Sequence, residues 1–257
     1  MSIFLIKILK KFLLLYLLSY LFLMLVFGIF LVITTPDVKD WKSKHPQKTS
    51  YMKYREKDKN YLKIRNKVFY KWIPLSQVPD LMQKTIIVSE DASFWSHEGI
   101  DWYEIRESLK KNIREGGFLR GGSTITQQVA RNLYLSPEKN VGRKIREWVI
   151  TKELEKSLTK SEILELYINI AEWGYNIFGI NAASQYYFQK SPQELTLNEM
   201  IRLAAVLPNP LDMKPNQLKR SVLWRSKVIL ERLRKFEYID AAQYEDSLSE
   251  LDSLFMG

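Results

Sequence analysis

Two adjacent acids, Glu90 and Asp91, follow a short apolar run and precede a segment that holds aromatic residues and a histidine, FWSHEG. The apolar run, residues 86–88, marks the end of an expected helix. A carboxyl group held against apolar surface has a raised pKa, which a general base or acid needs near neutral pH. Two solvated acids at a helix end are the alternative, and that alternative is the more common case. The pattern makes Glu90 a candidate catalytic residue, although the residues alone favour the solvated pair.

A second candidate site is the segment GGSTITQQVARN, residues 121–132. On a helix that starts near Ser123, the side chains of Thr124, Gln128 and Arg131 share one polar face. Hydroxyl, amide and guanidinium groups at a helix N-terminus, behind a glycine-rich loop, suit a sugar–phosphate ligand. The alternative is a polar surface stripe, although two neutral glutamines without an acid are unusual for one.

A third cluster lies in the segment GRKIREWVITKELEK, where Arg143 and Glu147 are i, i+4 neighbours and Lys144 lies beside them. As a routine surface ion pair it would contribute about 0.3–0.5 kcal/mol. As a functional group it would offer a second carboxylate flanked by cations that could hold a diphosphate. The residues alone favour the surface pair.

Helices must position these groups, because strand-like alternation is scarce along the chain. We predict helices at residues 81–91, 101–114, 123–135, 140–158, 160–171, 180–188, 196–206 and 216–236. Capping-box patterns begin three of them: Thr124-x-x-Gln127, Thr159-x-x-Glu162 and Thr196-x-x-Glu199. The last helix is basic and amphipathic, with an apolar side formed by Leu218, Val222, Ile229 and Leu233.

Residues 12–33 form an uncharged apolar run of 22 residues. Such a run spans a bilayer core as a helix. Lys7, Lys10 and Lys11 precede it, which places the N-terminus in the cytoplasm and the bulk of the chain outside. The run exceeds the apolar region of a signal peptide, which is about 7–15 residues long, and no A-x-A-like cleavage site follows Ile33. We therefore expect an uncleaved anchor.

The chain carries a net charge of +10 and contains no cysteine and two histidines. Zinc sites that need cysteine are excluded, and a histidine-rich metal centre is not expected. The basic balance suits anionic headgroups or a phosphate-bearing substrate, and a solvated basic surface is the alternative. No nucleic-acid partner is expected, because the bulk of the chain faces away from the cytoplasm.

Several long motifs, taken in order, resemble those of the peptidoglycan glycosyltransferase family, also called the transglycosylase domain of class A penicillin-binding proteins. The resemblance covers roughly residues 65–235 and is closest to the monofunctional branch. The matching segments are EDASFWSHEGID (90–101), GGSTITQQVARNLYL (121–135), RKIREWVITKELE (143–155), KSEILELYINIAEWG (160–174), and AASQYYFQK with LTLNEMIRLAAVLPNP within 182–210.

The resemblance implies a role for each matching residue. Glu90 matches the catalytic base, which deprotonates the 4-hydroxyl of the acceptor sugar, and Glu147 matches the second essential glutamate. Whether Glu147 orients the cations or assists departure of the leaving group stays open. The basic residues near the donor pyrophosphate match Arg143 and Lys144, and positions that line the donor groove match Ser123, Thr124, Gln128 and Asn132.

Arg131 departs from the family pattern T-Q-Q-x-x-K-N, which has lysine at this position. The positive charge is kept, but a guanidinium can bind phosphate through two hydrogen bonds, whereas an ammonium acts as a point charge. We retain Arg131 as a substrate-binding residue.

The expected fold is mainly α with one N-terminal transmembrane helix, and the resemblance implies a lysozyme-like helical lobe and a smaller membrane-proximal lobe. The expected order is a cytoplasmic N-terminus (1–11), an anchor (12–33), a juxtamembrane connector (34–65), the catalytic domain (66–240) and a C-terminal tail (241–257). The resemblance implies polymerisation of lipid II into glycan strands on the outer face of the inner membrane, by inverting transfer that releases undecaprenyl pyrophosphate. Expected partners are lipid II, the growing strand, the membrane and other cell-wall synthesis proteins. No cofactor is expected to be required, and a divalent cation such as Mg²⁺ or Mn²⁺ is the open alternative.

Two rival functions stay open at this stage. A lysozyme-like lytic enzyme would cleave the same polymer with a glutamate on a helical fold, but it would have no use for the cationic set Arg131, Arg143 and Lys144. A membrane-tethered scaffold without activity would have no need of both Glu90 and Glu147.

Overall fold

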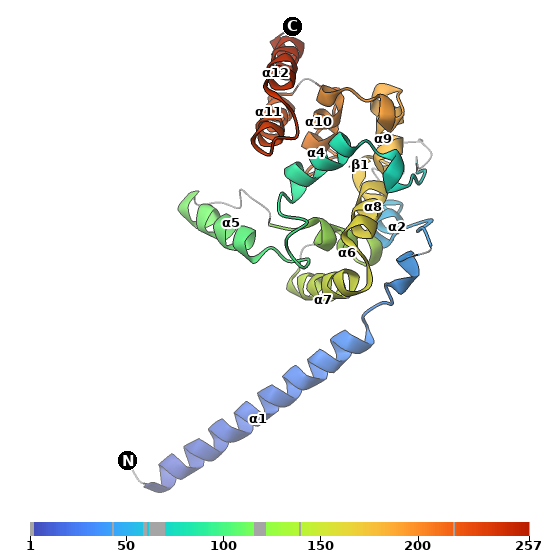
Figure 1. Cartoon of the computed structure of the whole chain (residues 1–257). Coiled ribbons are helices and arrows are strands. Elements are labelled where there is room, and N and C mark those ends of the chain that lie inside the picture. Colours follow the sequence, from blue (N-terminus) through green and yellow to red (C-terminus); the bar gives the residue numbers. More distant parts are fainter. Residues whose placement is uncertain are drawn as a thin grey trace. The chain divides into compact units, whose positions relative to one another are not determined.

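The computed structural model describes residues 3–42, 44–58, 61, 70–115, 122–138, 140–217 and 219–256. It divides into two compact units, Met1–Asp37 and Val38–Gly257 (Figure 1). The first unit is dominated by one helix, α1 (Ile3–Ile33). Its segment Lys7–Leu31 is long and apolar enough to cross a membrane, and none of its most apolar stretch is buried within the protein. The prediction of one N-terminal helix of membrane-spanning length is confirmed.

The second unit is mainly helical, as predicted, and the strands among its described residues form one short antiparallel hairpin. In chain order the elements are η1 (Lys39–Lys42), α2 (Ser50–Arg55), η2 (Leu75–Gln77), α4 (Asp80–Glu90), α5 (Trp102–Glu115), α6 (Ile125–Tyr134), α7 (Val141–Ser157), α8 (Lys160–Ile170), β1 (Glu172–Gly174), β2 (Ile177–Phe178), α9 (Ile180–Phe188), η3 (Pro192–Glu194), α10 (Leu197–Val206), α11 (Arg220–Lys235) and α12 (Ala241–Met256).

The three predicted capping boxes are all present. Thr124, Thr159 and Thr196 each cap a helix, and each hydroxyl accepts a hydrogen bond from a backbone N–H in the first turn. The prediction for the basic helix is less accurate, because α11 begins only at Arg220. Its apolar side is buried as expected at Val222, Ile229 and Leu233, and Leu218 lies outside the described residues.

The catalytic candidate Glu90 lies at a junction between two apolar clusters. In the larger cluster α6 packs on α7 and α8, and Ile86 and Ile87 of α4 belong to it. The smaller cluster joins α10, α11 and α12, and Val88 belongs to that one. Because consecutive residues of α4 are buried in different clusters, the last turn of this helix is held from two sides. Glu90, the last residue of α4, is fixed with it.

Packing extends beyond the expected catalytic domain at both ends. Val38, Met52 and Tyr61 are buried, although all three lie in the expected connector. At the other end, the expected tail forms α12, where Leu251 is fully buried and Ser247 exchanges hydrogen bonds with Asn198 of α10. The domain boundaries at residues 66 and 240 stay predictions, but the compact unit begins earlier and ends later.

Replacement of Gly99 by alanine is expected to lower stability by about 2 kcal/mol or more. Gly99 has a φ of +83°, and a Cβ there would lie 2.6 Å from Cγ2 of Thr151 and 2.8 Å from Cγ of Glu155. Chemical denaturation of the detergent-solubilised chain would measure the loss.

Gly142 provides the matched control, because its Cβ would meet one atom, Oδ1 of Asn140, at an ordinary 3.6 Å. Gly142 lies in the first turn of α7, where alanine favours the helix, so Gly142→Ala should be neutral or slightly stabilising. Equal losses for the two variants would contradict the packing described for Gly99.

Candidate functional site

Glu90 has the environment expected of a general base. Its side chain is half-buried, and its Oε2 accepts a 2.9 Å hydrogen bond from Nε2 of Gln128. Burial raises the pKa of the Glu90 carboxyl, while the Gln128 hydrogen bond and the charges of Arg225 and Arg131 act in the opposite direction. The net effect is a raised pKa, so this carboxylate is a better proton acceptor than a solvated one.

Tyr167 of α8 fixes the orientation of the Gln128 amide. Its hydroxyl donates to Oε1 of Gln128 over 3.4 Å, which leaves the amide Nε2 to donate to Glu90. Tyr167 is almost fully buried, and burial raises the pKa of its hydroxyl well above the ordinary value, so the hydroxyl remains protonated and able to donate. The sequence did not identify Tyr167 as a site residue, because it lies in an apolar helical stretch.

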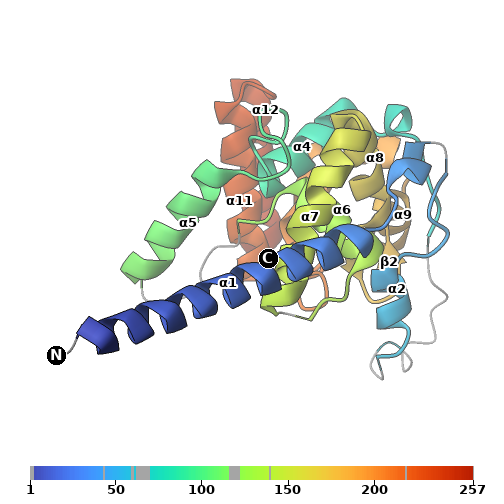
Figure 2. The ribbon, with the colours of Figure 1, turned by 90° about the horizontal axis from the view of Figure 1, so that it is seen from below.

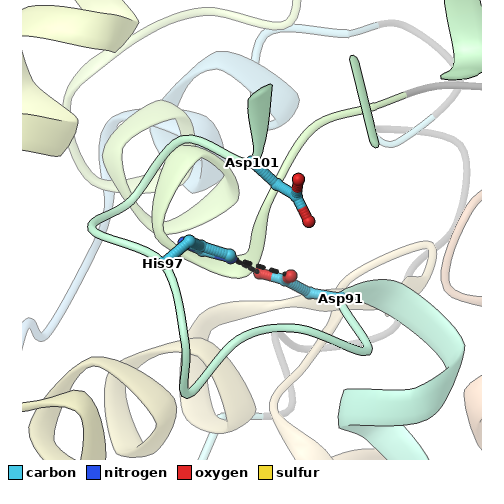
Figure 3. A group of neighbouring side chains, drawn as sticks. All are labelled: Asp91, His97 and Asp101. Atoms are coloured by element: carbon cyan, nitrogen blue, oxygen red, sulfur yellow. Dashed lines mark hydrogen bonds and ion pairs between the residues drawn. The ribbon is translucent and has the colours of Figure 1, made fainter. Parts of the chain in front are cut away.

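Asp91 links the end of α4 to the start of α6. Its carboxylate accepts from Nε2 of His97 at 2.9 and 3.1 Å (Figure 3). Its Oδ2 also accepts from the backbone N–H of Ile125 at 2.9 Å. Since Nδ1 of His97 accepts from the N–H of Gly99, the proton of a neutral imidazole lies on Nε2, toward Asp91. Asp91 is thus a structural brace beside the catalytic candidate.

Asp101 lies near this pair in Figure 3, and the ligand atoms of Asp91, His97 and Asp101 lie within 4.8 Å of one another. That spacing would suit a metal ion, but the hydrogen-bonding pattern does not. His97 would have to release the proton that it shares with Asp91, and Asp101 already accepts from Ser93 and from the backbone N–H of Glu104. The residues as arranged form a hydrogen-bonded brace rather than an open coordination set.

Glu147 is fully buried, so the interpretation of the third cluster as an exposed ion pair is wrong. One carboxylate oxygen accepts from Arg143 and the other from Lys144. The ammonium of Lys144 also donates to Oγ of Ser123 over 3.1 Å. With both of its oxygens engaged, Glu147 holds two cations in fixed positions near the start of α6.

A cavity of about 190 Å³ lies beside the second half of α6. Three of the predicted site residues line it: Gln128, Arg131 and Asn132. The other wall residues come from segments that the sequence did not mark as part of the site: Tyr51, Arg55, Tyr167, Ala171, Glu172 and residues 207–211. Because Gln128 also donates to Glu90, the cavity is connected to the catalytic candidate through one side chain.

The predicted site residues therefore form two groups along α6. Ser123 joins the Arg143–Lys144–Glu147 group at its start, and Gln128, Arg131 and Asn132 line the cavity further along. Thr124 belongs to neither group: it is buried, caps α6 and donates to the carbonyl of Gly99 over 2.6 Å. Its assignment to the donor groove stays a prediction, as do the roles of the others.

Arg225 of α11 is a further residue near the site that the sequence did not mark. Its Nε donates to the carbonyl of Ala205 over 2.7 Å, which holds it at the end of α10, and its charge acts on Glu90. Arg232, about two helical turns further along, donates to the carbonyl of Val88 over 2.7 Å. No local pattern distinguishes these two arginines from the other basic residues of the amphipathic helix.

Comparison with known proteins places the chain in a family. A family model described as "Transglycosylase" matches residues 58–234. A biosynthetic peptidoglycan transglycosylase from Herminiimonas arsenicoxydans is 38% identical over 200 residues, which cover 77% of this chain and 85% of that protein. A protein of the same name from Janthinobacterium sp. (strain Marseille) is 37% identical over 193 residues, 75% of this chain and 84% of the relative.

Among solved structures, the crystal structure of penicillin-binding protein 1A from Haemophilus influenzae matches with a TM-score of 0.39 and 22% identity. The match covers 70% of this chain and 17% of that one, a likeness too distant to carry an argument. The family match and the relatives, by contrast, cover most of the chain and include the motifs around Glu90 and Glu147. The chain belongs to the transglycosylase family.

Proposed function

We propose that this protein polymerises lipid II, the lipid-linked disaccharide of the cell wall, into peptidoglycan glycan strands. The transfer inverts the anomeric centre and releases undecaprenyl pyrophosphate. The observation that carries the proposal is the half-buried Glu90, whose pKa is raised and whose carboxylate is aligned by Gln128 beside a cationic cavity. This is the pairing of base and anion-binding groups that the reaction needs.

In the proposed step, the carboxylate of Glu90 accepts the proton of the 4-hydroxyl of the acceptor sugar. The hydroxyl oxygen then attacks C1 of the donor sugar from the face opposite the leaving group. The new C1–O bond forms as the bond from C1 to the pyrophosphate oxygen breaks, and the electron pair leaves with the pyrophosphate. A single displacement of this kind inverts C1 and needs one carboxylate as base.

Cations serve the leaving group better than a proton donor, because a pyrophosphate is already ionised when it departs. Glu147 holds Arg143 and Lys144 for this role. Arg131 lines the cavity together with Gln128, which donates a hydrogen bond to Glu90. Ser123 and Asn132 would complete the polar lining. Because both oxygens of Glu147 are engaged by cations, we assign it to positioning them and not to proton donation.

This assignment needs no cofactor, since Arg143 and Lys144, held by Glu147, and Arg131, which lines the cavity, supply the positive charge that a departing pyrophosphate requires. A divalent cation could assist the leaving group, but Asp91, His97 and Asp101 do not offer it an open site as they are arranged. Activity measured in a chelator such as EDTA tests this part of the proposal. Loss of activity in EDTA that added Mg²⁺ or Mn²⁺ restores would contradict it.

We place the enzyme in the cytoplasmic membrane with its catalytic unit on the outer side. The support is α1, which has the length and hydropathy of a membrane span, and the lysines that precede its apolar core. Helix α5, which stands off from the other helices of its unit in Figure 1, exposes large apolar side chains suited to a lipid surface: Trp102, Tyr103, Leu109 and Ile113. Recruitment by other cell-wall synthesis proteins stays a prediction.

One assay separates this function from its two rivals. The purified full chain in detergent is incubated with lipid-linked disaccharide, and in a second reaction with preformed glycan. Long glycan products from the first reaction support synthesis. Shortening of preformed glycan would show a lytic enzyme, and the absence of turnover in both reactions would favour a scaffold.

The pH dependence of synthesis should follow the ionisation of Glu90. A base must be deprotonated to act. The raised pKa of Glu90 therefore predicts that kcat/KM begins to fall at a higher pH than it would if the base were a solvated glutamate. Gln128→Leu removes a hydrogen bond that favours the carboxylate, so the acidic limb of the profile should move to higher pH. Measurement of kcat/KM against pH for both proteins checks this, and an unmoved limb would contradict the coupling.

A further inference from the structure

Arg55, which precedes the residues matched by the family model, lines the cavity beside Arg131. It is the last residue of α2, a short helix that packs on α6. Its guanidinium carbon lies 5.0 Å from the ring centre of Tyr51 and 5.2 Å from that of Tyr61. Contacts with two aromatic rings fix the plane of a guanidinium, so Arg55 is presented to the cavity in a defined orientation.

The partner of Arg55 is Glu172, the first residue of β1, which lines the same cavity. The two join through one contact, from Nη2 of Arg55 to Oε2 of Glu172 at 2.9 Å. A guanidinium and a carboxylate can form two parallel hydrogen bonds, and here the second is not made. Among the described residues, Nε of Arg55 and Oε1 of Glu172 are both buried without a hydrogen-bond partner.

A buried ion pair with one hydrogen bond is easier for a ligand to replace than a bidentate pair. Each polar group left without a partner carries an uncompensated cost of burial. The hydroxyl of Tyr51 accepts from Nη2 of Arg55 at 3.0 Å, and the charges of Arg55 and Arg131 both act on Tyr51. Two guanidinium groups therefore face one small polar cavity, and Glu172 is the single carboxylate among its described lining residues. That arrangement suits an anion with several oxygens.

We propose that Arg55 is a substrate-binding residue that joins Arg131 in holding a diphosphate group of the lipid-linked substrate, with Glu172 occupying the guanidinium when the cavity is empty. The inference rests on the proposed function for the identity of the substrate. It assigns part of the site to the segment that lies between α1 and the family-matched residues.

Glu172 makes the binding depend on pH. Burial raises the pKa of its carboxyl to about 7, with the charge of Arg55 acting against the shift and that of Asp58 adding to it. Within the part of the chain that the structure describes, the other ionisable groups that line the cavity are Tyr51, Arg55, Arg131 and Tyr167. An ionised Glu172 repels a diphosphate and retains Arg55, so binding should weaken as the pH rises through about 7.

Binding of inorganic pyrophosphate to the detergent-solubilised full chain, measured by calorimetry, tests the proposal together with KM and kcat on lipid-linked disaccharide. Arg55→Met should weaken pyrophosphate binding and raise KM by about 10-fold with a much smaller change in kcat. Arg55→Lys should recover part of the loss. Glu172→Gln removes the competing charge, so it should bind pyrophosphate at least as well as the wild type, and its affinity should vary less with pH.

Lys190→Met is the matched control, since it removes one cation and one partly buried ion pair, with Glu199, outside the cavity. It should leave both pyrophosphate affinity and KM unchanged. Because pyrophosphate itself titrates near neutral pH, the readout is the difference between the wild type and Glu172→Gln at each pH.

A purely structural ion pair would give the opposite pattern. Arg55→Met and Glu172→Gln would then lose stability and activity alike, with pyrophosphate affinity unchanged, and this result would overturn the inference. Wild-type synthesis without any dependence of KM on Arg55 would also overturn it, while the proposed function would stand. Arg55-dependent pyrophosphate binding in a chain that makes no glycan would support the inference and remove the proposed function.

Discussion

Replacement of Glu90 by glutamine is expected to abolish glycan synthesis, by about 10³-fold or more, while the protein stays folded. Glutamine keeps the shape of the side chain and an oxygen that can accept from Gln128, but it cannot take a proton from the acceptor hydroxyl. Synthesis from lipid-linked disaccharide and the midpoint of chemical denaturation would be measured on the same preparation. Near-normal synthesis would remove the assignment of Glu90 as the base.

The same substitution should not lower stability near neutral pH. The pKa of Glu90 is raised in the folded protein, so the folded state favours the neutral carboxyl, and its ionisation at pH 7 costs stability. A neutral amide relieves that cost, and the inactive variant should be at least as stable as the wild type. The matched control is Glu98→Gln, which changes an exposed acid in the loop after α4 whose surface ion pair with Lys152 spans 3.9 Å, and it should alter neither quantity.

Replacement of Glu147 by glutamine is expected to reduce both stability and activity. Glu147 is fully buried between Arg143 and Lys144, so removal of its charge leaves two cations without their counterion. Loss of one partner from a buried ion pair costs about 3 kcal/mol. Synthesis should fall by about 10²-fold, because cations that are no longer held in place stabilise a departing pyrophosphate less well.

Chemical denaturation and glycan synthesis are both measured on Glu147→Gln at a temperature where the variant remains folded. Together they show whether Glu147 positions the two cations or takes part directly in the reaction. A variant of unchanged stability with no activity would contradict the positioning role and favour Glu147 as a direct participant. Glu153→Gln, a half-buried acid on the same helix, is the control and should keep wild-type activity.

Local signals predicted the helices well, because a capping box or an apolar period depends on residues a few positions apart. The predicted helix at 180–188 coincides with α9, and Thr124, Thr159 and Thr196 cap the helices that they were expected to begin. The expected tail is the exception. Its burial depends on α10 and α11, so α12 leaves no strong signal in its own sequence.

The site was harder to predict, because burial and pairing depend on distant segments. Arg143 and Glu147 have the spacing of a surface pair, and only the packing around α7 makes Glu147 a buried group. Arg55 and Glu172 are 117 positions apart, so their contact cannot be inferred from any short pattern. Motif resemblance identified Glu90 and Glu147, but it did not reach Arg55, whose place in the cavity depends on how α2 packs.

The hydrogen bonds of Asp91 complete a closed ring of linked residues around the site. Glu90 is bonded covalently to Asp91, Asp91 holds the first residue of α6, and the next turn of α6 carries Gln128, which returns to Glu90. Glu90 and Gln128 cannot separate unless one link in this ring breaks. The base is therefore oriented when the chain folds, and each sugar addition begins from a carboxylate that has less rotational freedom to lose than a solvated one.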